Sequence, residues 1–343
     1  MNVLLTCVGL RVDVVHAFRD AVGRRGEGGR VIGTDMQELA PAVRFCDDWE
    51  RLPIAIDPAY TELLLDLAER RGARCVVPCS EFDLVQLADA RERFRAIGAE
   101  VWIPDPGPTR QTVDKLLMAR FLDEHRIPGP RTFAPEELPD DLSFPVLVKM
   151  REGMGSKHIH RCRDRRELDF FLDYAEVASI VQEACPGEEF SIDLLCDLDG
   201  RCVEAVPRTM LQSKGGEQIK GTTIADPELI EVGRTVAEAL PLRGFATVQC
   251  FRVAPGRHEV TDVNPRVGGA FPLPLAAGVD FPALVLAMTA GERVEPRLGS
   301  FRAGVTLSRF FHQVVLEENG SERTTRLDQL SLPRAQEPVA APS

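Results

Sequence analysis

The amino-terminal third of the chain alternates short apolar runs with stretches whose apolar residues recur every three or four positions. The short runs predict buried strands, and the three-and-four spacing predicts helices that pack on a sheet. The expected strands are 3–8, 30–34, 75–78 and 100–103, and the expected helices are 12–22, 60–71 and 82–97. Their alternation predicts a doubly wound, Rossmann-like α/β domain over residues 1–108.

Beyond the turn residues Asp105-Pro106-Gly107-Pro108 the pattern changes. A helix is expected over 109–125, with Thr109 or Thr112 as its N-cap, and a second over 226–239. The strands expected after residue 128 are 145–150, 179–183, 190–197, 202–206, 246–253 and 259–263. The close succession of these strands favours hairpins, so the pattern predicts an α+β domain over residues 109–316. The apolar residues of 317–343 show little periodicity, which predicts a flexible tail.

Composition narrows the class of protein. With 343 residues, 44% of them hydrophobic, the chain is long enough for two or three packed units. Its 53 acidic and 41 basic residues give a net charge of −12, which argues against a nucleic-acid partner. No apolar run approaches the roughly 20 residues of a membrane span, and the apolar opening predicts a strand, not a signal peptide. The nine cysteines lie mostly in apolar runs, as reduced thiols of a cytoplasmic protein do.

The first candidate for chemistry is a strand that ends in Lys149 and leads into a glycine-containing loop with Gly153, Gly155 and Ser156. Glycines allow successive backbone N–H groups to face a polyphosphate, and the lysine adds a positive charge. The lysine precedes the glycines, so this is not a Walker loop. Taken alone, the segment also fits an ordinary hairpin turn.

A second candidate is the connector between two expected strands that holds Glu183, Cys185 and Glu189. Its backbone can contact an adenine edge and its carboxylates can contact ribose hydroxyls. An acidic turn without a ligand is the alternative. In the first domain, the sequence Val8-Gly9-Leu10-Arg11 lacks the three glycines of a dinucleotide site, so NAD is not expected.

A third candidate is the hairpin formed by 247–251 and 259–264. Asp262 and Asn264 point to one face of a strand, where they can join Gln249 as oxygen ligands of Mg²⁺, and Arg266 extends that face. A solvated strand edge is the alternative reading of these side chains.

Charged residues near these segments are candidates for substrate binding. Three cations, Arg208, Lys214 and Lys220, lie between the glycine loop and the metal strand, which is the expected strand 259–264. This region is expected to be a loop, and its positive charges could bind an acidic substrate. Glu81 and Asp83 follow a strand at the carboxyl edge of the first sheet, where doubly wound sheets bind ligands, and fit a cationic amine. The alternatives are solvated loop charges for the cations and helix N-capping for the acids.

Taken together, Lys149 with its glycine loop, Gln182-Glu183, Gln249 and the run from Asp262 to Arg266 resemble the ATP-grasp superfamily in their order and spacing. The pair Asp114-Lys115 fits the same pattern. The resemblance is greatest to ligases of the carbamoyl-phosphate-synthetase type and covers residues 1 to about 315. It implies a Rossmann-like first domain followed by a two-lobed ATP-grasp domain, with a lid lobe at about 128–183.

The resemblance also implies a role for each matching position. Lys115 and Lys149 contact ATP phosphates, and Gly153, Gly155 and Ser156 lie in the lid. Glu183 and Cys185 meet adenine through backbone atoms, and Glu189 holds ribose. Gln249, Asp262 and Asn264 hold magnesium, and Arg266 stabilises the phosphorylated intermediate. Members of the family usually have Glu at the position of Asp262, so the resemblance implies a weaker metal site in this chain.

The implied activity is that of a carboxylate-amine ligase: ATP phosphorylates an acid, and an amine displaces phosphate to give an amide or peptide-like bond. ATP and Mg²⁺, with Mn²⁺ as a substitute, are the expected cofactors, and a homodimer is expected. The remaining alternatives are a bicarbonate-phosphorylating carboxylase or carbamoyl-transfer enzyme, and a nucleotide-binding module without turnover.

Overall fold

The computed structural model describes residues 1–153, 158–214, 217–310, 312–316 and 322–324. Met1–Ser308 form one compact unit, and Arg309–Ser343 form a second. In the second unit, β17 (Val314–Leu316) pairs antiparallel with β18 (Glu322–Thr324). The tail expected after residue 316 lies mostly outside the described residues, and its described part, 322–324, is a strand.

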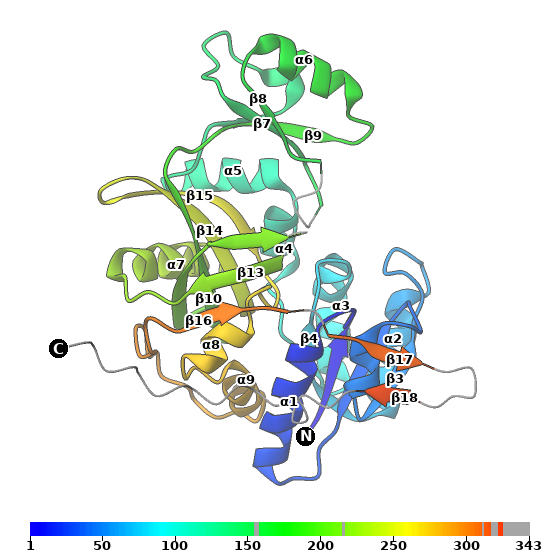
Figure 1. Cartoon of the computed structure of the whole chain (residues 1–343). Coiled ribbons are helices and arrows are strands. Elements are labelled where there is room, and N and C mark those ends of the chain that lie inside the picture. The colour runs from blue at the N-terminus through cyan, green and yellow to red at the C-terminus, as the bar shows by residue number, and fades with distance from the viewer. Residues whose placement is uncertain (154–157, 215–216, 311, 317–321, 325–343) are drawn as a thin grey trace, which may run out of the picture. The chain divides into compact units, whose positions relative to one another are not determined.

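The first domain is built on a five-stranded parallel sheet in the order β3-β2-β1-β4-β5. Val3 and Leu5 of β1 face a core that includes α1, whereas Leu4 faces a second core with α2 and α3, so helices cover both faces (Figure 1). The elements are β1 Asn2–Thr6, α1 Val12–Arg25, β2 Val31–Asp35, the 3₁₀ helix η1 Pro41–Phe45, β3 Asp48–Arg51, α2 Tyr60–Arg70, β4 Ala73–Pro78, α3 Leu84–Ala96 and β5 Glu100–Val101. The expected doubly wound domain is confirmed. The edge strand β3 was not predicted because Trp49 is its only apolar residue.

The single helix expected over 109–125 is wrong. Two helices are present, α4 (Pro106–Val113) and α5 (Lys115–Glu124), separated by Asp114 in an extended conformation. Thr109 and Thr112 are not N-caps: they lie inside α4, and their hydroxyls donate to backbone carbonyls. Asp114 is the N-cap of α5 and accepts from the N–H groups of Leu116 and Leu117. Aspartate favours this position because its short side chain can accept from N–H groups of the first helical turn, which have no acceptor within the helix.

The lid lobe contains an antiparallel sheet in the order β6-β9-β7-β8 (Figure 1). One face packs on α6 through Leu168, which joins Val146, Val148 and Val181 in a small core. The elements are β6 Thr132–Phe133, the 3₁₀ helix η2 Pro135–Glu137, β7 Val146–Met150, β8 His160–Cys162, α6 Arg165–Tyr174 and β9 Ser179–Glu183.

The larger lobe contains an antiparallel sheet in the order β11-β10-β14-β15, with α7 packed on it through Leu229, Val236 and Ala237. A smaller sheet has the order β12-β13-β16. The elements are β10 Glu188–Cys196, β11 Cys202–Thr209, β12 Gln212–Lys214, β13 Glu217–Thr222, α7 Pro227–Ala239, β14 Gly244–Ala254, β15 Arg257–Asn264, α8 Pro272–Ala276, α9 Phe281–Thr289 and β16 Thr306–Ser308. The expected antiparallel hairpins of this region are therefore present.

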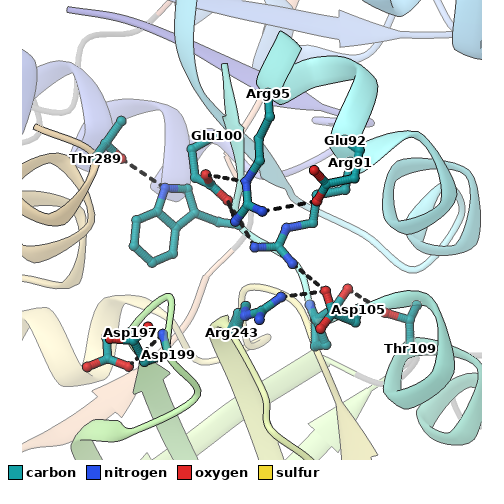
Figure 2. Close-up of polar contacts among 12 residues, drawn as sticks. Arg91, Glu92, Arg95, Glu100, Asp105, Thr109, Asp197, Asp199, Arg243 and Thr289 are labelled. Carbon is teal, nitrogen blue, oxygen red and sulfur yellow. Dashed lines mark hydrogen bonds and ion pairs between the residues drawn. The ribbon is translucent and has the colours of Figure 1, made fainter. Parts of the chain in front are cut away.

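The first domain and the larger lobe share one core. Phe18 of α1 packs edge-on against Phe245 of β14, with ring centroids 6.2 Å apart. The indole of Trp102 donates to the hydroxyl of Thr289 at 2.9 Å. Figure 2 shows the polar side of this junction, where the carboxylate of Asp105 accepts from both Arg91 and Arg243. These contacts explain why Met1–Ser308 form a single compact unit.

The cysteines and the helix lengths can be compared with what composition led us to expect. All nine cysteines are free thiols, six of them buried. In the described part of the chain, no helix is both long and apolar enough to span a membrane.

Candidate active site

The three residues expected to hold magnesium lie together on the hairpin of β14 and β15. Gln249 is paired directly with Asp262, and Thr247 is paired with Asn264. The amide of Asn264 donates to Oδ2 of Asp262 at 3.2 Å, and the amide of Gln249 donates to Oε1 of Glu189 at 3.1 Å. Two carboxylates and two amides therefore form a continuous polar patch on the hairpin and the neighbouring strand β10.

This donor set fits a magnesium ion. Mg²⁺ takes few oxygen ligands from a protein and completes its octahedral shell with phosphates and water. The described residues contain no group of three or more His, Cys, Asp and Glu side chains that would hold a metal by themselves. Asp262 with the amide oxygens of Gln249 and Asn264 instead provides the sparse set that suits a nucleotide-bound Mg²⁺.

Lys149 of β7 lies near enough to two of these acids, Asp262 and Glu189, for their charges to act on it. Its ammonium donates to Oε1 of Gln182 at 2.7 Å. Burial lowers the pKa of Lys149, whereas the nearby charges of Asp262 and Glu189 act to raise it and that of Lys115 acts to lower it. The two lysines expected to contact phosphates are thus electrostatically coupled to each other and to the expected metal ligand. An anionic ligand stabilises the charged form of a desolvated ammonium such as this one.

The start of the glycine loop is hydrogen-bonded to the start of α5. The ammonium of Lys115 donates to the carbonyl of Gly153 at 2.8 Å, and its backbone N–H donates to the carbonyl of Arg151 at 3.0 Å. The guanidinium of Arg151 in turn pairs with Asp114 at 2.7 Å. Gly155 and Ser156, which were also expected in the lid, lie outside the described residues.

The connector expected to meet adenine has both of its named side chains engaged elsewhere. Oε1 of Glu183 accepts from Arg131 and from the backbone N–H of Ser143, each at 3.1 Å. The thiol of Cys185 donates to Glu259 at 3.3 Å, and burial together with Glu259 raises the pKa of Cys185 to about 12. The backbone N–H of Glu183 also donates to the carbonyl of Arg131 at 2.9 Å, and that of Ala184 to the carbonyl of Pro145 at 3.0 Å. The adenine contact expected of this connector stays a prediction.

Glu189, the residue expected to hold ribose, lies on β10 and accepts a hydrogen bond from Gln249 of the neighbouring strand β14. Burial raises the pKa of Glu189, and Lys149 and the hydrogen bond from Gln249 act to lower it. The carboxylate is therefore part of the same cluster as Asp262.

Arg266 and Glu81 were expected to serve different substrates, yet they contact each other. Nε of Arg266 donates to Oε1 of Glu81 at 2.9 Å. Both side chains are less than one-fifth exposed. The pair joins the loop after β15 to the loop after β4, so it connects the metal strand to the first domain.

The assignment of Arg208 to a substrate-binding loop is corrected. Arg208 lies in β11, its side chain is 3% exposed, and its guanidinium forms a two-point pair with Asp193 at 2.7 and 3.2 Å. Thr247 donates to the same carboxylate. The charge of Arg208 is neutralised inside the lobe, where a buried guanidinium requires such a partner.

The assignment of Asp83 to an amine site is also corrected. Asp83 is fully buried, and its carboxylate accepts from the hydroxyl of Tyr60 at 2.7 Å. It occupies the N-cap position of α3 without a side-chain capping bond. Lys220 is exposed on β13, and Lys214 lies in β12 with a side chain outside the described residues.

Three contacts made by the candidate residues were not predicted from the sequence. Gln182 was noted in its motif without a role, and it is the hydrogen-bond partner of Lys149. Arg151 and Asp193 are the ion-pair partners of Asp114 and Arg208. The position of Asp193 in an apolar strand was the available signal, because a buried acid requires a partner.

Comparison with known proteins gives two family matches. The family described as "ATP-grasp in the biosynthetic pathway with Ter operon" matches residues 175–310, and "PylC-like, N-terminal domain" matches residues 3–102. The carbamoyl phosphate synthase large chain of Halobacterium salinarum is 25% identical over 242 residues, which are 65% of this chain and 21% of that protein. The chain thus spans about a fifth of the length of this relative.

Solved structures share the fold. The L-amino acid ligase of Bacillus licheniformis superposes with a TM-score of 0.68 at 18% identity, over 89% of this chain and 78% of that one. The biotin carboxylase domain of the Hydrogenobacter thermophilus 2-oxoglutarate carboxylase, solved as a dimer with MgADP and bicarbonate, gives 0.67 at 17% identity, over 89% and 73% of the two chains.

Proposed function

We propose, from the premise that this chain belongs to the ATP-grasp superfamily, that it is an ATP-dependent ligase that joins a carboxylate to an amine. The expected family and fold class are confirmed by the family matches and the shared fold. The family contains ligases and carboxylases that use ATP. The amide-forming reaction, the residues that perform it and the substrates are our proposal.

One observation carries the proposal: Lys149 of the lid lobe interacts electrostatically with Asp262 and Glu189 of the larger lobe, and a second lysine, Lys115, lies near it. Polyphosphate with a magnesium ion has the complementary pattern, because its oxygens accept from lysines and also bind the metal. We infer that the triphosphate of ATP lies between Lys149 and the β14–β15 hairpin.

No protein nucleophile is needed for the proposed reaction. A carboxylate oxygen of the acid attacks the γ-phosphorus, the bond between that phosphorus and the β–γ bridging oxygen breaks, and ADP leaves. The ammonium of the second substrate gives one proton to solvent, and its uncharged nitrogen attacks the acyl carbon. Phosphate leaves with the electron pair of the acyl C–O bond and takes up the second proton of the nitrogen. Mg²⁺, held by Gln249, Asp262 and Asn264, would supply charge neutralisation. Lys149 and Lys115 orient the phosphates, and Arg266 stabilises the negative charge of the acyl phosphate.

The Arg266–Glu81 pair gives this proposal a defined substrate step. An incoming carboxylate competes with Glu81 for the guanidinium of Arg266, because both are anions that accept the same N–H groups. When the acid binds Arg266, Glu81 is released and can accept from the ammonium of the second substrate. Glu81 therefore stays in the proposal as the amine-selecting residue, whereas Asp83 is withdrawn because it is buried.

The experiment that tests the ligase is a panel of carboxylates incubated with ATP, Mg²⁺ and hydroxylamine. Hydroxylamine traps an acyl phosphate as a hydroxamate, and ADP is measured in the same samples. We expect one class of acid to raise hydroxamate and ADP together, and Asn264→Ala to lose both. Arg19→Ala, which removes a surface arginine of α1 paired with Asp47, is the control that keeps both. A broad panel in which no acid raises ADP above background overturns the ligase.

A second candidate is a bicarbonate-phosphorylating carboxylase or carbamoyl-transfer enzyme, favoured by the likeness to a carbamoyl phosphate synthase and to a biotin carboxylase domain. ADP release that depends strictly on bicarbonate supports this candidate. A nucleotide-binding module without turnover predicts ATP binding with no ADP under any condition. We also propose a homodimer, as the biotin carboxylase domain was solved as a dimer, and light scattering of the purified chain tests this.

A further inference from the structure

The loop that follows the metal strand is held by an arginine of the first domain. Arg11, which follows β1, donates to the carbonyl of Val267 at 3.1 Å and to the carbonyl of Gly268 at 2.9 Å. Arg11 is 9% exposed, and both hydrogen bonds are buried. Two guanidinium nitrogens thus fix two consecutive carbonyls immediately after Arg266.

The opposite side of the same loop is packed against the larger lobe. A Cβ atom on Gly268 would lie 2.6 Å from Oδ1 of Asp193 and 2.6 Å from Oγ1 of Thr247. Asp193 cannot readily move aside, because Arg208 and Thr247 both bind its carboxylate. The backbone at Gly268 is therefore fixed between Arg11 on one side and the Asp193 pair on the other.

This position matters for the residues that precede it. Asn264, an expected magnesium ligand, and Arg266 are separated from Gly268 by only a few residues, and the N–H of Arg266 donates to the carbonyl of Asn264 at 2.9 Å. A shift of the loop at Val267 and Gly268 would carry both side chains with it. Sub-ångström placement of charge-stabilising groups decides how well they stabilise a transition state.

We infer that Arg11 is a positioning residue for the reaction: from the first domain, it fixes the backbone that sets the placement of Arg266 and Asn264. The inference rests on the proposed function for its kinetic consequence, but its structural part stands by itself. Arginine suits the role because its planar fork reaches two carbonyls at once, which a single ammonium does in a less fixed geometry. Arg11 also pairs with Asp13 at 3.2 Å, which orients the fork.

The first test measures the loop and not the activity. Hydrogen exchange followed by mass spectrometry is compared for the wild type, Arg11→Ala, Arg11→Lys and the control Arg19→Ala. We expect peptides that span 264–271 to exchange at least tenfold faster in Arg11→Ala, at an intermediate rate in Arg11→Lys and at the wild-type rate in Arg19→Ala. Unchanged exchange of these peptides in Arg11→Ala overturns the inference, whether or not the chain is a ligase.

The second test uses turnover with the acid identified by the hydroxamate panel. We expect kcat of Arg11→Ala to fall at least tenfold while KM for MgATP changes less than threefold, with partial recovery in Arg11→Lys or on addition of guanidinium ion. An equal loss in kcat and ATP binding, or no loss, contradicts the positioning role. If the wild type has no turnover, the proposed function fails, and the exchange experiment alone decides the role of Arg11.

Gly268→Ala provides an independent variant if Arg11→Ala folds poorly. It leaves the guanidinium in place and displaces the loop from its opposite side. We expect the same split, a lower kcat with ATP binding retained. Wild-type turnover and wild-type exchange in Gly268→Ala would show that the loop is not constrained at this point, which contradicts the inference.

Discussion

Asp114 joins the start of α5 to the strand that leads into the glycine loop, and its removal is expected to lower the free energy of unfolding by about 2 kcal/mol. Its Oδ1 accepts from the N–H of Leu116 at 2.9 Å and of Leu117 at 3.1 Å. Loss of such an N-cap costs about 1 kcal/mol. Its Oδ2 pairs with Arg151, whose side chain is 36% exposed, and a partly exposed pair contributes at most about 1 kcal/mol. Asp114→Ala removes both contributions.

Asp114→Asn separates the two contributions. Asparagine is as good an N-cap as aspartate, so this variant should lose only the ion pair, about 1 kcal/mol. Arg151→Gln should lose the same amount, and the double variant Asp114→Asn/Arg151→Gln should be no less stable than either single one. Chemical denaturation of the wild type and the four variants measures these differences. If Asp114→Asn is as unstable as Asp114→Ala, the cap contributes nothing and the reasoning is refuted.

The pH dependence gives an additional check. Burial acts to raise the pKa of Asp114, but the hydrogen bonds from Arg151 and from the two backbone N–H groups bring it below its ordinary value. A carboxyl group whose pKa is lower in the folded state contributes stability above its unfolded pKa of about 4 and loses it as the pH falls through the folded pKa. The stability difference between the wild type and Asp114→Asn should therefore be constant from pH 8 to 5 and vanish under more acidic conditions.

Three further predictions follow from the structure. Asp262→Ala should reduce ADP release at least about 100-fold, because it removes the carboxylate of the proposed metal site, whereas Asp262→Glu should retain activity. ADP measured against Mg²⁺ concentration checks this, and activity that survives in Asp262→Ala places the metal elsewhere. Glu204→Gln should stabilise the protein by about 1 to 3 kcal/mol more at pH 8 than at pH 5, because burial raises the pKa of Glu204 to about 7. The destabilisation by this carboxyl grows between its unfolded pKa of about 4 and its folded pKa and is complete near pH 8. Thermal unfolding at the two pH values measures the effect, and equal shifts would contradict it. Gly187→Ala should destabilise the protein by about 2 kcal/mol or more, because φ is +102° and a Cβ atom would lie 2.1 Å from the carbonyl oxygen of Arg252. A wild-type unfolding midpoint for this variant would show that the turn accommodates a side chain.

The sequence was sufficient for the fold wherever local pattern and burial agree. The parallel strands of the first domain and the hairpins of the larger lobe follow from runs such as 75–78 and 246–253, in which apolar residues outnumber the rest. Prediction from the sequence failed where a single residue ends a helix that the apolar spacing would continue. The apolar spacing of 109–125 continues through Asp114, and only the capping preference of that residue divides the helix.

The sequence likewise predicted some positions of the candidate site and missed others. The side chains on one strand face, Asp262 and Asn264, could be placed together because the period of a strand is two. Arg208 and Asp83 were placed wrongly because their partners, Asp193 and Tyr60, come from other elements, and no local pattern reveals them. The contact between Arg266 and Glu81 spans 185 positions and required the folded chain.

The packing of Phe18 against Phe245 has a consequence for protein engineering. A fragment cut near residue 108 would leave one ring of this pair in solvent on each side, and it would also divide the core that both belong to. Exchange of amino-terminal segments between relatives should therefore yield soluble chimeras only when Phe245 and the two rings packed on it, Phe271 and Phe281, are transferred together with Phe18. Crossover points chosen from sequence boundaries alone would miss this requirement.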